Sequence, residues 1–418
     1  MTDAASDDAP IDLTLLPPAL RAADLAVLAA EFGTPLFVYD EEHLRARCRE
    51  YVTAFGAGNV AYAGKAFLCA AMVRLVAEEG LHLDVATGGE LHVARHAGFP
   101  PDRLVMHGNN KSDAEIAQAR DAGVGRVVAD SFDEIDRLER LGFAGEVLVR
   151  VTPGVEAHTH EFIQTGTDDS KFGFTVSTGA AADAVARVAS SSGLRFGGIH
   201  AHIGSQVFRM DSYAEAAGVV ARFADECERA TGVAIPLVNL GGGLGARYLA
   251  SDPDPSVAEY AAALRTGIGG RRVMVEPGRS IAAVAGVTVY RVGTVKRIAG
   301  GRTYVAVDGG MSDNPRPVLY GAGYEAYLPE RAGARRSLRC AVAGKHCEQG
   351  DVIVADARLP EDVAVGDLLV TPVTGAYGYS MASNYNKVPR PAVVFVRNGV
   401  PRPVVRRETD ADLVRLDL

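Results

Sequence analysis

The stretch RLVMHGNNKSDAEIAQARDAGVGRVVAD, residues 103–130, contains the repeating unit that decides the fold. It opens with the β-rich run RLVMHG (103–108) and passes through a polar loop to DAEIAQARDAG (113–123). The apolar residues of that second segment recur at spacings of three and four, and the segment ends at glycine, a helix stop signal. A second β-rich run, RVVAD (126–130), follows. A strand, a helix and a strand in this order predict a βαβ unit.

The same unit recurs from about residue 58 to residue 280. Eight strands that alternate with helices predict a (β/α)8 barrel of the TIM type. The alternative is an open doubly wound sheet, which more often has five to seven strands. The eight β-rich runs are NVAYAG (59–64), LHLDVA (81–86), RLVMHG (103–108), RVVAD (126–130), EVLVRV (146–151), FGGIHAHI (196–203), PLVNLG (236–241) and RVMVEP (272–277).

The alternation stops after about residue 284, and short β-branched runs broken by Gly, Pro and Asn take its place. We therefore expect a barrel over residues 41–284 and an all-β domain, sandwich-like or barrel-like, over residues 285–418. The run PLFVYD (35–40) precedes the barrel and is expected to join the β-domain through the N-terminal segment 30–40. The acidic first residues, 1–12, are expected to be disordered.

Composition excludes several classes of protein. Lys and Arg total 43 against 52 Asp and Glu, a formal charge of −9, which argues against a nucleic-acid or anionic-membrane binder. The five cysteines are scattered without a C-x-x-C pair, so neither a disulfide framework nor a zinc module is expected. No apolar run is long enough to span a bilayer, and no basic residue precedes an apolar stretch at the N-terminus. These features predict a cytoplasmic enzyme.

Polar residues gather where the predicted strands end. In a (β/α)8 barrel these positions form the face that carries the chemistry, so their convergence is informative. The residues are Lys65, Asp84, Thr87, His107, Asn109, Arg150, His200, His202, Ser205, Gly241 to Gly243, Glu276 and Arg279.

Two of these features suit a phosphorylated carbonyl cofactor. Lys65, in YAGKAF, follows a buried-looking strand, and desolvation there would lower its pKa as Schiff-base formation requires. The alternative is a lysine that extends to solvent. The run NLGGGLG (239–245) offers backbone amides after a strand and before a possible helical turn, which favours phosphate. The alternative is a tight turn.

Two further motifs bear on the chemistry. His200 and His202, in IHAHIGSQ, point to the same face of a strand, as in metal hydrolases, although packed histidines are the simpler interpretation. In EPGRS, Glu276 could face a heterocyclic nitrogen and Arg279 could bind an anion, or the two could pair with each other. A lysine, a phosphate cradle and a carboxylate together are what pyridoxal phosphate requires.

From about residue 30 almost to its end, the sequence resembles the diaminopimelate decarboxylase family, in the alanine-racemase-like group of pyridoxal-phosphate-dependent decarboxylases. The resemblance is carried by ten short segments in family order. They are YAGKAF, DVATGGEL, HGNNK, TGTDDSKFG, HAHIGSQ, GGGLG, EPGRS, NPRPVLY, CEQGD and GAYGYSMASNYN.

The resemblance implies a cofactor site for pyridoxal 5'-phosphate and no metal. Lys65 would form the internal aldimine, His200 would stack on the pyridine ring, and Glu276 would pair with the pyridine nitrogen. Asp84 is assigned to the same site. The phosphate would be held by Ser205, Gly242, Gly243, Gly278, Arg279 and Tyr377.

The resemblance also implies a substrate site. Arg279, Arg316 and Tyr320, with Tyr377 beside them, would bind the substrate and its retained carboxylate. Cys347 would donate a proton and Glu348 would recognise the distal amino group. In the family these last two residues reach the active site of the opposite subunit, so a homodimer with shared sites is implied.

The implied reaction is the decarboxylation of meso-2,6-diaminopimelate to L-lysine and CO₂, the last step of lysine biosynthesis. The alternative is a related decarboxylase of ornithine, lysine or arginine, against which Arg316 and Glu348 argue, because a monocarboxylate gives Arg316 nothing to bind. Gln349 stands where the family usually has a small hydroxyl residue, and Thr87 where Ser is usual. Both departures bear on substrate preference or rate.

Overall fold

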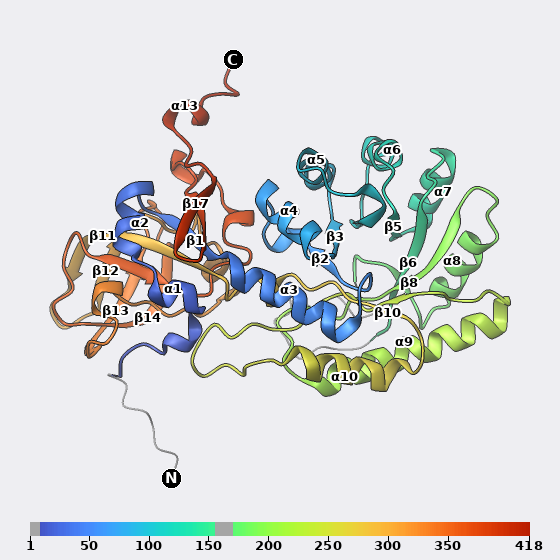
Figure 1. Ribbon diagram of the computed structural model, residues 1–418, viewed down its shortest axis with the longest axis horizontal. Helices are drawn as coiled ribbons and strands as arrows, with labels where there is room; N and C mark the ends of the chain where they lie inside the picture. The colour runs from blue at the N-terminus through green and yellow to red at the C-terminus, as the bar shows by residue number, and fades with distance from the viewer. Residues whose placement is uncertain (1–8, 155–169) are drawn as a thin grey trace, which may run out of the picture. The chain divides into compact units, whose positions relative to one another are not determined.

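The computed structural model describes residues 9–154 and 170–418, which form two compact units (Figure 1). The first, which we call the β unit, comprises Met1–Leu44, Ala246–Pro253 and Ile281–Leu418. The second, the barrel unit, comprises Arg45–Gly245 and Asp254–Ser280. The grouping of 246–253 with the β unit is a detail that the sequence pattern did not predict.

The barrel unit is built on parallel strands, as predicted. Every neighbouring pair along the order β10-β9-β8-β6-β5-β4-β3-β2 is parallel, and a parallel bridge between Val60 and Val275 joins the two ends. The prediction of a (β/α)8 barrel is therefore confirmed. The strands are β2 (Ala61–Ala63), β3 (His82–Val85), β4 (Leu104–Met106), β5 (Arg126–Ala129), β6 (Glu146–Thr152), β8 (Arg195–His200), β9 (Val238–Asn239) and β10 (Val273–Met274).

Helices surround these strands (Figure 1). The segment 103–130 forms β4, α6 and β5 as predicted. Its helix α6 begins with a capping box between Ser112 and Glu115 and ends at Gly123 in the left-handed conformation. A two-residue strand, β7 (Phe174–Thr175), pairs with β6 and was not predicted. The helices are α4 (Ala70–Glu78), α5 (Gly88–His96), α6 (Asp113–Ala122), α7 (Phe132–Arg140), α8 (Ala180–Ala189), α9 (Met210–Thr231), α10 (Val257–Ile268) and α11 (Arg279–Ala282).

The barrel interior is closed by apolar side chains. One packed cluster consists of apolar residues in or next to six of the barrel strands, all at most 3% exposed, namely Ala61, Val105, Val128, Leu148, Leu237 and Met274. This core fills the axis of the barrel, so polar groups are confined to the ends of the strands.

The β unit contains a mixed sheet into which the N-terminal strand is inserted. β1 (Leu36–Asp40) pairs antiparallel with β11 (Gly286–Arg297) and parallel with β16 (Ala392–Arg397). α3 (Glu41–Phe55) separates β1 from β2 along the chain. The remaining strands are β12 (Thr303–Val307), β13 (Leu338–Ala343), β14 (Val352–Leu359), β15 (Leu368–Thr371) and β17 (Val400–Val405). The short helices are α1 (Pro18–Ala22), α2 (Leu25–Phe32), α12 (Arg316–Tyr320) and α13 (Asp410–Leu413).

The N-terminal segment for which disorder was expected is described only in part. Residues 1–8 lie outside the described residues. Ile11 is buried in the core of the β unit, and Asp12 caps the 3-10 helix Leu13–Leu15, so the packed chain begins earlier than expected. Among residues 9–154 and 170–418, no helix combines the length and apolar character needed to cross a membrane.

A buried ion pair joins the loop after β4 to the first turn of α7. Lys111 Nζ donates to Gly108 O at 2.7 Å, Val128 O at 2.7 Å and Glu134 Oε1 at 2.6 Å. Both charged side chains are at most 1% exposed. Removing one partner of such a pair leaves a buried charge without compensation.

We therefore expect Lys111→Met to lower the free energy of unfolding by about 3–5 kcal/mol. Urea denaturation followed by circular dichroism measures this loss. The double variant Lys111→Met/Glu134→Leu removes both charges and should lose clearly less stability. Equal losses in the single and double variants would contradict the explanation.

Candidate active site

Five buried ionisable side chains gather at the C-terminal ends of the barrel strands. All are at most 8% exposed. They are Asp84 in β3, His107 after β4, Arg150 in β6, His200 at the end of β8, and Glu276 after β10. The convergence expected at the strand ends is thus present for these residues, whereas Thr87 and Asn109 are exposed.

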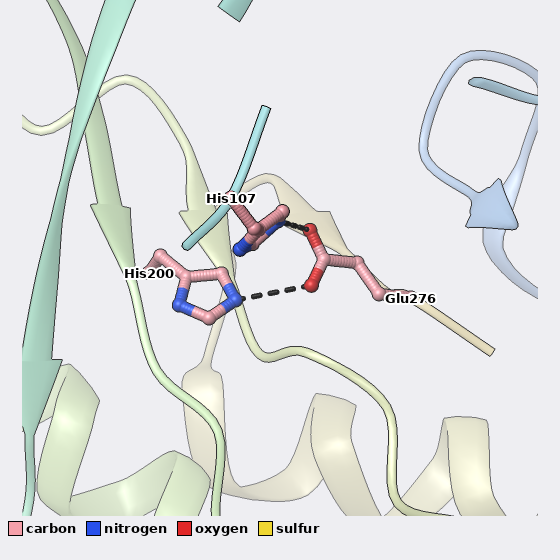
Figure 2. A group of neighbouring side chains, drawn as sticks. All are labelled: His107, His200 and Glu276. Atoms are coloured by element: carbon pink, nitrogen blue, oxygen red, sulfur yellow. Dashed lines mark hydrogen bonds and ion pairs between the residues drawn. The ribbon is translucent and has the colours of Figure 1, made fainter. Parts of the chain in front are cut away.

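Glu276 lies at the centre of this group. His107 Nε2 donates to Glu276 Oε1 at 2.8 Å, and His200 Nε2 donates to Glu276 Oε2 at 3.1 Å (Figure 2). Asn239 Nδ2 donates to Oε1 at 2.7 Å. Three donors therefore converge on one buried carboxylate, and they favour its ionised form.

The electrostatics of the group agree with this geometry. Burial acts to raise the pKa of Glu276, but the charges and hydrogen bonds of His107 and His200 hold that pKa well below its usual range. Burial raises the pKa of Asp84 to about 6 and lowers that of His200 to about 4. Burial also acts to lower the pKa of His107, but Asp84 and Glu276 raise it overall. The site thus keeps an anion at Glu276 and a neutral ring at His200 near pH 7.

Lys65 lies on the short 3-10 helix Gly64–Ala66, directly after β2. Its side chain is exposed, so the expected desolvation is wrong. β2 ends at Ala63, and Lys65 is the middle residue of the 3-10 turn that follows. Burial raises the pKa values of the Asp84 and Glu90 carboxyl groups, and the charge of Lys65 opposes that rise. Lys65 therefore offers an accessible amine close to the buried group.

The glycine run follows β9 in an irregular, closely packed backbone conformation. Gly241 and Gly243 have φ of +66° and +118°, and a Cβ on Gly242 would lie 2.3 Å from Glu276 O. Gly242 N donates to His202 Nδ1 at 3.3 Å. The expectation that a helical turn follows is wrong, because α10 begins only at Val257. The run therefore offers backbone amides without a helix dipole.

Arg279 and Ser205, both predicted to hold phosphate, come together in the barrel unit. Arg279 Nε and Nη2 donate to Ser205 Oγ at 3.1 Å and 2.9 Å. Gly278 is packed so closely that a Cβ would lie 3.0 Å from the Cβ atoms of Ala63 and Ala66. A guanidinium group and a hydroxyl group side by side suit an anion such as phosphate.

The barrel residues fit pyridoxal phosphate. Glu276 supplies an ionised carboxylate for a protonated ring nitrogen, and Lys65 supplies an accessible amine. His200 Nδ1 is buried and has no hydrogen-bond partner within the part of the chain that the structure describes. The packed glycine run and the Arg279–Ser205 pair supply donors for an anion.

The alternative of a metal site was based on His200 and His202. His200 Nε2 faces Glu276 whereas His202 Nδ1 accepts from Gly242 N, and among the described residues no cluster of possible metal ligands contains both histidines. The ligand atoms of His107, His200 and Glu276 do lie within 4.8 Å of one another. However, each imidazole Nε2 donates a hydrogen to the carboxylate, so its lone pair is not available to a metal. The arrangement therefore favours an internal hydrogen-bond cluster.

The β unit contains the residues assigned to substrate binding. Arg316 is 6% exposed, its guanidinium lies 4.3 Å from the centroid of the Tyr248 ring, and Nη1 donates to Tyr324 OH. Arg316 Nε is buried without a hydrogen-bond partner among the described residues. Tyr320 and Tyr377 are half-buried, and Tyr377 has φ of +60°. Arg316, to which the resemblance assigns substrate binding, thus keeps one buried donor without a partner among the described residues.

Cys347 and Glu348 lie exposed on a loop of the β unit that is tightly anchored on both sides. Cys347 N donates to Asn386 Oδ1 at 3.2 Å. The buried His346 lies 2.8 Å (Nε2) from Ser312 Oγ, and Asp351 Oδ2 accepts from His346 N at 2.8 Å. The loop thus presents the Cys347 thiol from a fixed backbone.

Sequence reasoning missed Asn239, His346 and Asn386. Asn239 stands within the run NLGGGLG, and a polar side chain in a barrel strand could have indicated a site residue.

The two departures from the family pattern differ in whether the structure explains them. Thr87 caps α5 by accepting from Glu90 N at 3.2 Å, which serine does equally well, whereas Gln349 is exposed and nothing in the structure explains it. The segment TGTDDSKFG lies partly outside the described residues.

A (β/α)8 barrel with a lysine, an ionised carboxylate and a glycine-rich anion site at its mouth defines a pyridoxal-phosphate-dependent enzyme. Residues 41–283 match the family model described as pyridoxal-dependent decarboxylase, pyridoxal binding domain. This match, together with relatives that are 47% and 50% identical over nearly the whole chain, shows that the chain belongs to the diaminopimelate decarboxylase family.

The similarity extends over nearly the whole chain. Diaminopimelate decarboxylase of Mycobacterium tuberculosis is 50% identical over 416 residues, covering 94% of this chain and 93% of the relative. That of Bacillus subtilis is 47% identical, covering 96% and 94%. The crystal structure of diaminopimelate decarboxylase from Helicobacter pylori complexed with L-lysine superposes with a TM-score of 0.87 at 30% identity, covering 94% and 99%.

Proposed function

We propose that this chain decarboxylates meso-2,6-diaminopimelate to L-lysine and CO₂, with pyridoxal 5'-phosphate as cofactor. The observation that carries the proposal is the buried Glu276 carboxylate with its three converging donors at the barrel mouth. A relative at 50% identity bears the name of this activity, and a similar structure was solved with L-lysine.

The barrel residues would hold the cofactor in a defined way. Lys65 would bind its carbonyl carbon, while Ser205, Arg279 and the amides of Gly242 and Gly243 would hold its phosphate. When bound, pyridoxal phosphate supplies a ring that accepts the electron pair left behind by CO₂. Glu276 would hold a proton at the ring nitrogen, because it is kept ionised by its donors.

The choice of substrate rests on Arg316. Its guanidinium is buried against Tyr248 and Tyr324, and its Nε has no hydrogen-bond partner among residues 9–154 and 170–418. Diaminopimelate keeps one carboxylate after decarboxylation, and that group would satisfy this donor. Ornithine has a single carboxylate, which is the one lost, so it would leave Arg316 unpaired at a cost in transition-state binding. Arg279, Tyr320 and Tyr377 complete the proposed substrate set.

The proposal also assigns roles to Cys347 and Glu348. Cys347 would donate a proton to the carbon that lost CO₂, and Glu348 would bind the distal ammonium group. We propose that both come from the partner chain of a homodimer and that the reaction takes place in the cytoplasm.

Lysine formation measured on purified holoenzyme tests the proposal. We expect turnover of meso-diaminopimelate to exceed that of ornithine, lysine or arginine by at least about 10⁴-fold, since a site built around a polar group rejects an analogue that lacks it. Activity should survive a metal chelator and fall when the cofactor is removed. A preference for ornithine would overturn the choice of substrate, and loss of activity to the chelator would overturn the cofactor assignment.

A further inference from the structure

We propose that Asn239 and His107 are positioning residues that fix one oxygen of Glu276, so that its other oxygen is presented to the cofactor ring. The inference rests on the proposed function and extends it to two residues to which the family resemblance gave no role. Neither residue is expected to touch the substrate, and both act through Glu276.

The two carboxylate oxygens of Glu276 are used unequally. Oε1 accepts from His107 Nε2 at 2.8 Å and from Asn239 Nδ2 at 2.7 Å, which occupies both of its lone-pair sites. Oε2 accepts a single hydrogen bond among the described residues, from His200 Nε2 at 3.1 Å, the longest of the three. Oε2 is therefore the oxygen with capacity for a further donor, the protonated ring nitrogen.

Asn239 connects this carboxylate to the glycine run. Its Nδ2 donates to Glu276, and its Oδ1 accepts from Gly241 N at 2.9 Å. The side chain is 0% exposed, so water cannot replace either bond. An asparagine amide can make both bonds at once because it carries a donor and an acceptor. One residue thus sets the position of the ring carboxylate relative to the backbone that would hold phosphate.

His107 supplies the second hydrogen bond to Oε1. Its Nε2 lies 3.8 Å from Asp84 Oδ1, so it stands between two carboxyl groups. The charge of Arg150 also acts on this cluster, where it opposes protonation of both histidines. Burial alone would favour a protonated Glu276, which could not serve as a counter-ion to a ring proton. His107 therefore helps to keep Glu276 anionic.

Asn239→Asp tests the inference, because aspartate keeps the shape but removes the donor and adds a negative charge beside Oε1. We expect kcat to fall by about 10²-fold with KM nearly unchanged, as for loss of a preorganised electrostatic contact. The dissociation constant for pyridoxal phosphate, measured by titrating cofactor-depleted full-length protein, should rise by about tenfold. The visible absorption band of the bound cofactor should also change.

Two comparisons separate positioning from a merely structural role. Asn59→Asp makes the same change at the opposite end of the barrel, where Asn59 Nδ2 donates to Phe55 O at 3.0 Å, and it should leave kcat and the absorption band unchanged. His107→Gln keeps a donor and should retain most of the activity, whereas His107→Leu should not. This second pair keeps the test valid if Asn239→Asp fails to fold.

The outcomes distinguish this inference from the function on which it rests. Wild-type kcat, cofactor affinity and absorption in Asn239→Asp would overturn it, as would equal losses in His107→Gln and His107→Leu. If the wild-type chain forms no lysine from diaminopimelate, the proposed function fails. The cofactor titration would then still decide whether Asn239 and His107 position Glu276.

Discussion

Lys65→Ala is expected to abolish decarboxylation, with a loss of about 10³-fold or more in kcat, because it removes the amine that would bind the cofactor covalently. Lys65 is exposed directly after β2, and its charge acts on Asp84 and Glu90, so it is accessible and close to the buried carboxylate. The variant should still bind pyridoxal phosphate weakly through the remaining residues. It should lack the visible absorption band that the wild-type holoenzyme shows.

Borohydride reduction gives a second measurement. It should attach the cofactor permanently to the wild-type chain, and peptide mass spectrometry should locate the added mass on Lys65. Lys296→Ala, which replaces an exposed lysine in β11, is the matched control and should behave as wild type. Covalent label on a different lysine, or substantial turnover by Lys65→Ala, would disprove the assignment.

Periodicity was sufficient to predict the barrel. The eight predicted barrel strands, which are two to seven residues long, were each visible as an apolar run, because parallel strands covered by helices are apolar on both faces. β1 was also recognisable, since its five residues are all buried. The two-residue β7 and the attachment of 246–253 to the β unit were not predictable. Both depend on long-range packing that leaves no local pattern.

The site was predictable in its composition but less so in its geometry. The strand ends identified Glu276, His200, His107 and Asp84 because barrel topology brings strand ends together regardless of sequence distance. The degree of burial was harder to predict. Lys65 is exposed because a short 3-10 turn follows β2, and that turn has no signal in YAGKAF. Likewise, the link from Asn239 to Glu276 spans 37 residues and depends on the register between β9 and β10.

Cys347→Ala is the second variant with a large expected effect. The loop that carries Cys347 is fixed by Asn386 and by the buried His346, while the thiol itself is exposed. The other four cysteines are buried, and burial raises the pKa of Cys48 and Cys340 to about 12. If Cys347 delivers the proton, its loss should lower kcat by about 10²–10⁴-fold, the range for a positioned general acid.

Two measurements check the effect of Cys347→Ala. An alkylating reagent at neutral pH should modify one fast-reacting thiol in the wild-type chain and none in the variant. Cys347→Ser should also be impaired, because a hydroxyl group is a much weaker acid than a thiol. Full activity in Cys347→Ala, with unchanged circular dichroism, would remove Cys347 from the mechanism.

Mixing the two inactive variants tests whether active sites are shared between chains. If Cys347 of one chain serves Lys65 of its partner, a mixed dimer of Lys65→Ala and Cys347→Ala has one intact site and one that carries both defects. Random exchange makes half of the dimers mixed, so about a quarter of the wild-type activity should return. If each chain completed its own site, every site in the mixture would carry one defect and no activity would return. Co-expression with two different affinity tags allows the mixed dimer to be purified and assayed directly, so that a failure to exchange cannot be mistaken for an unshared site.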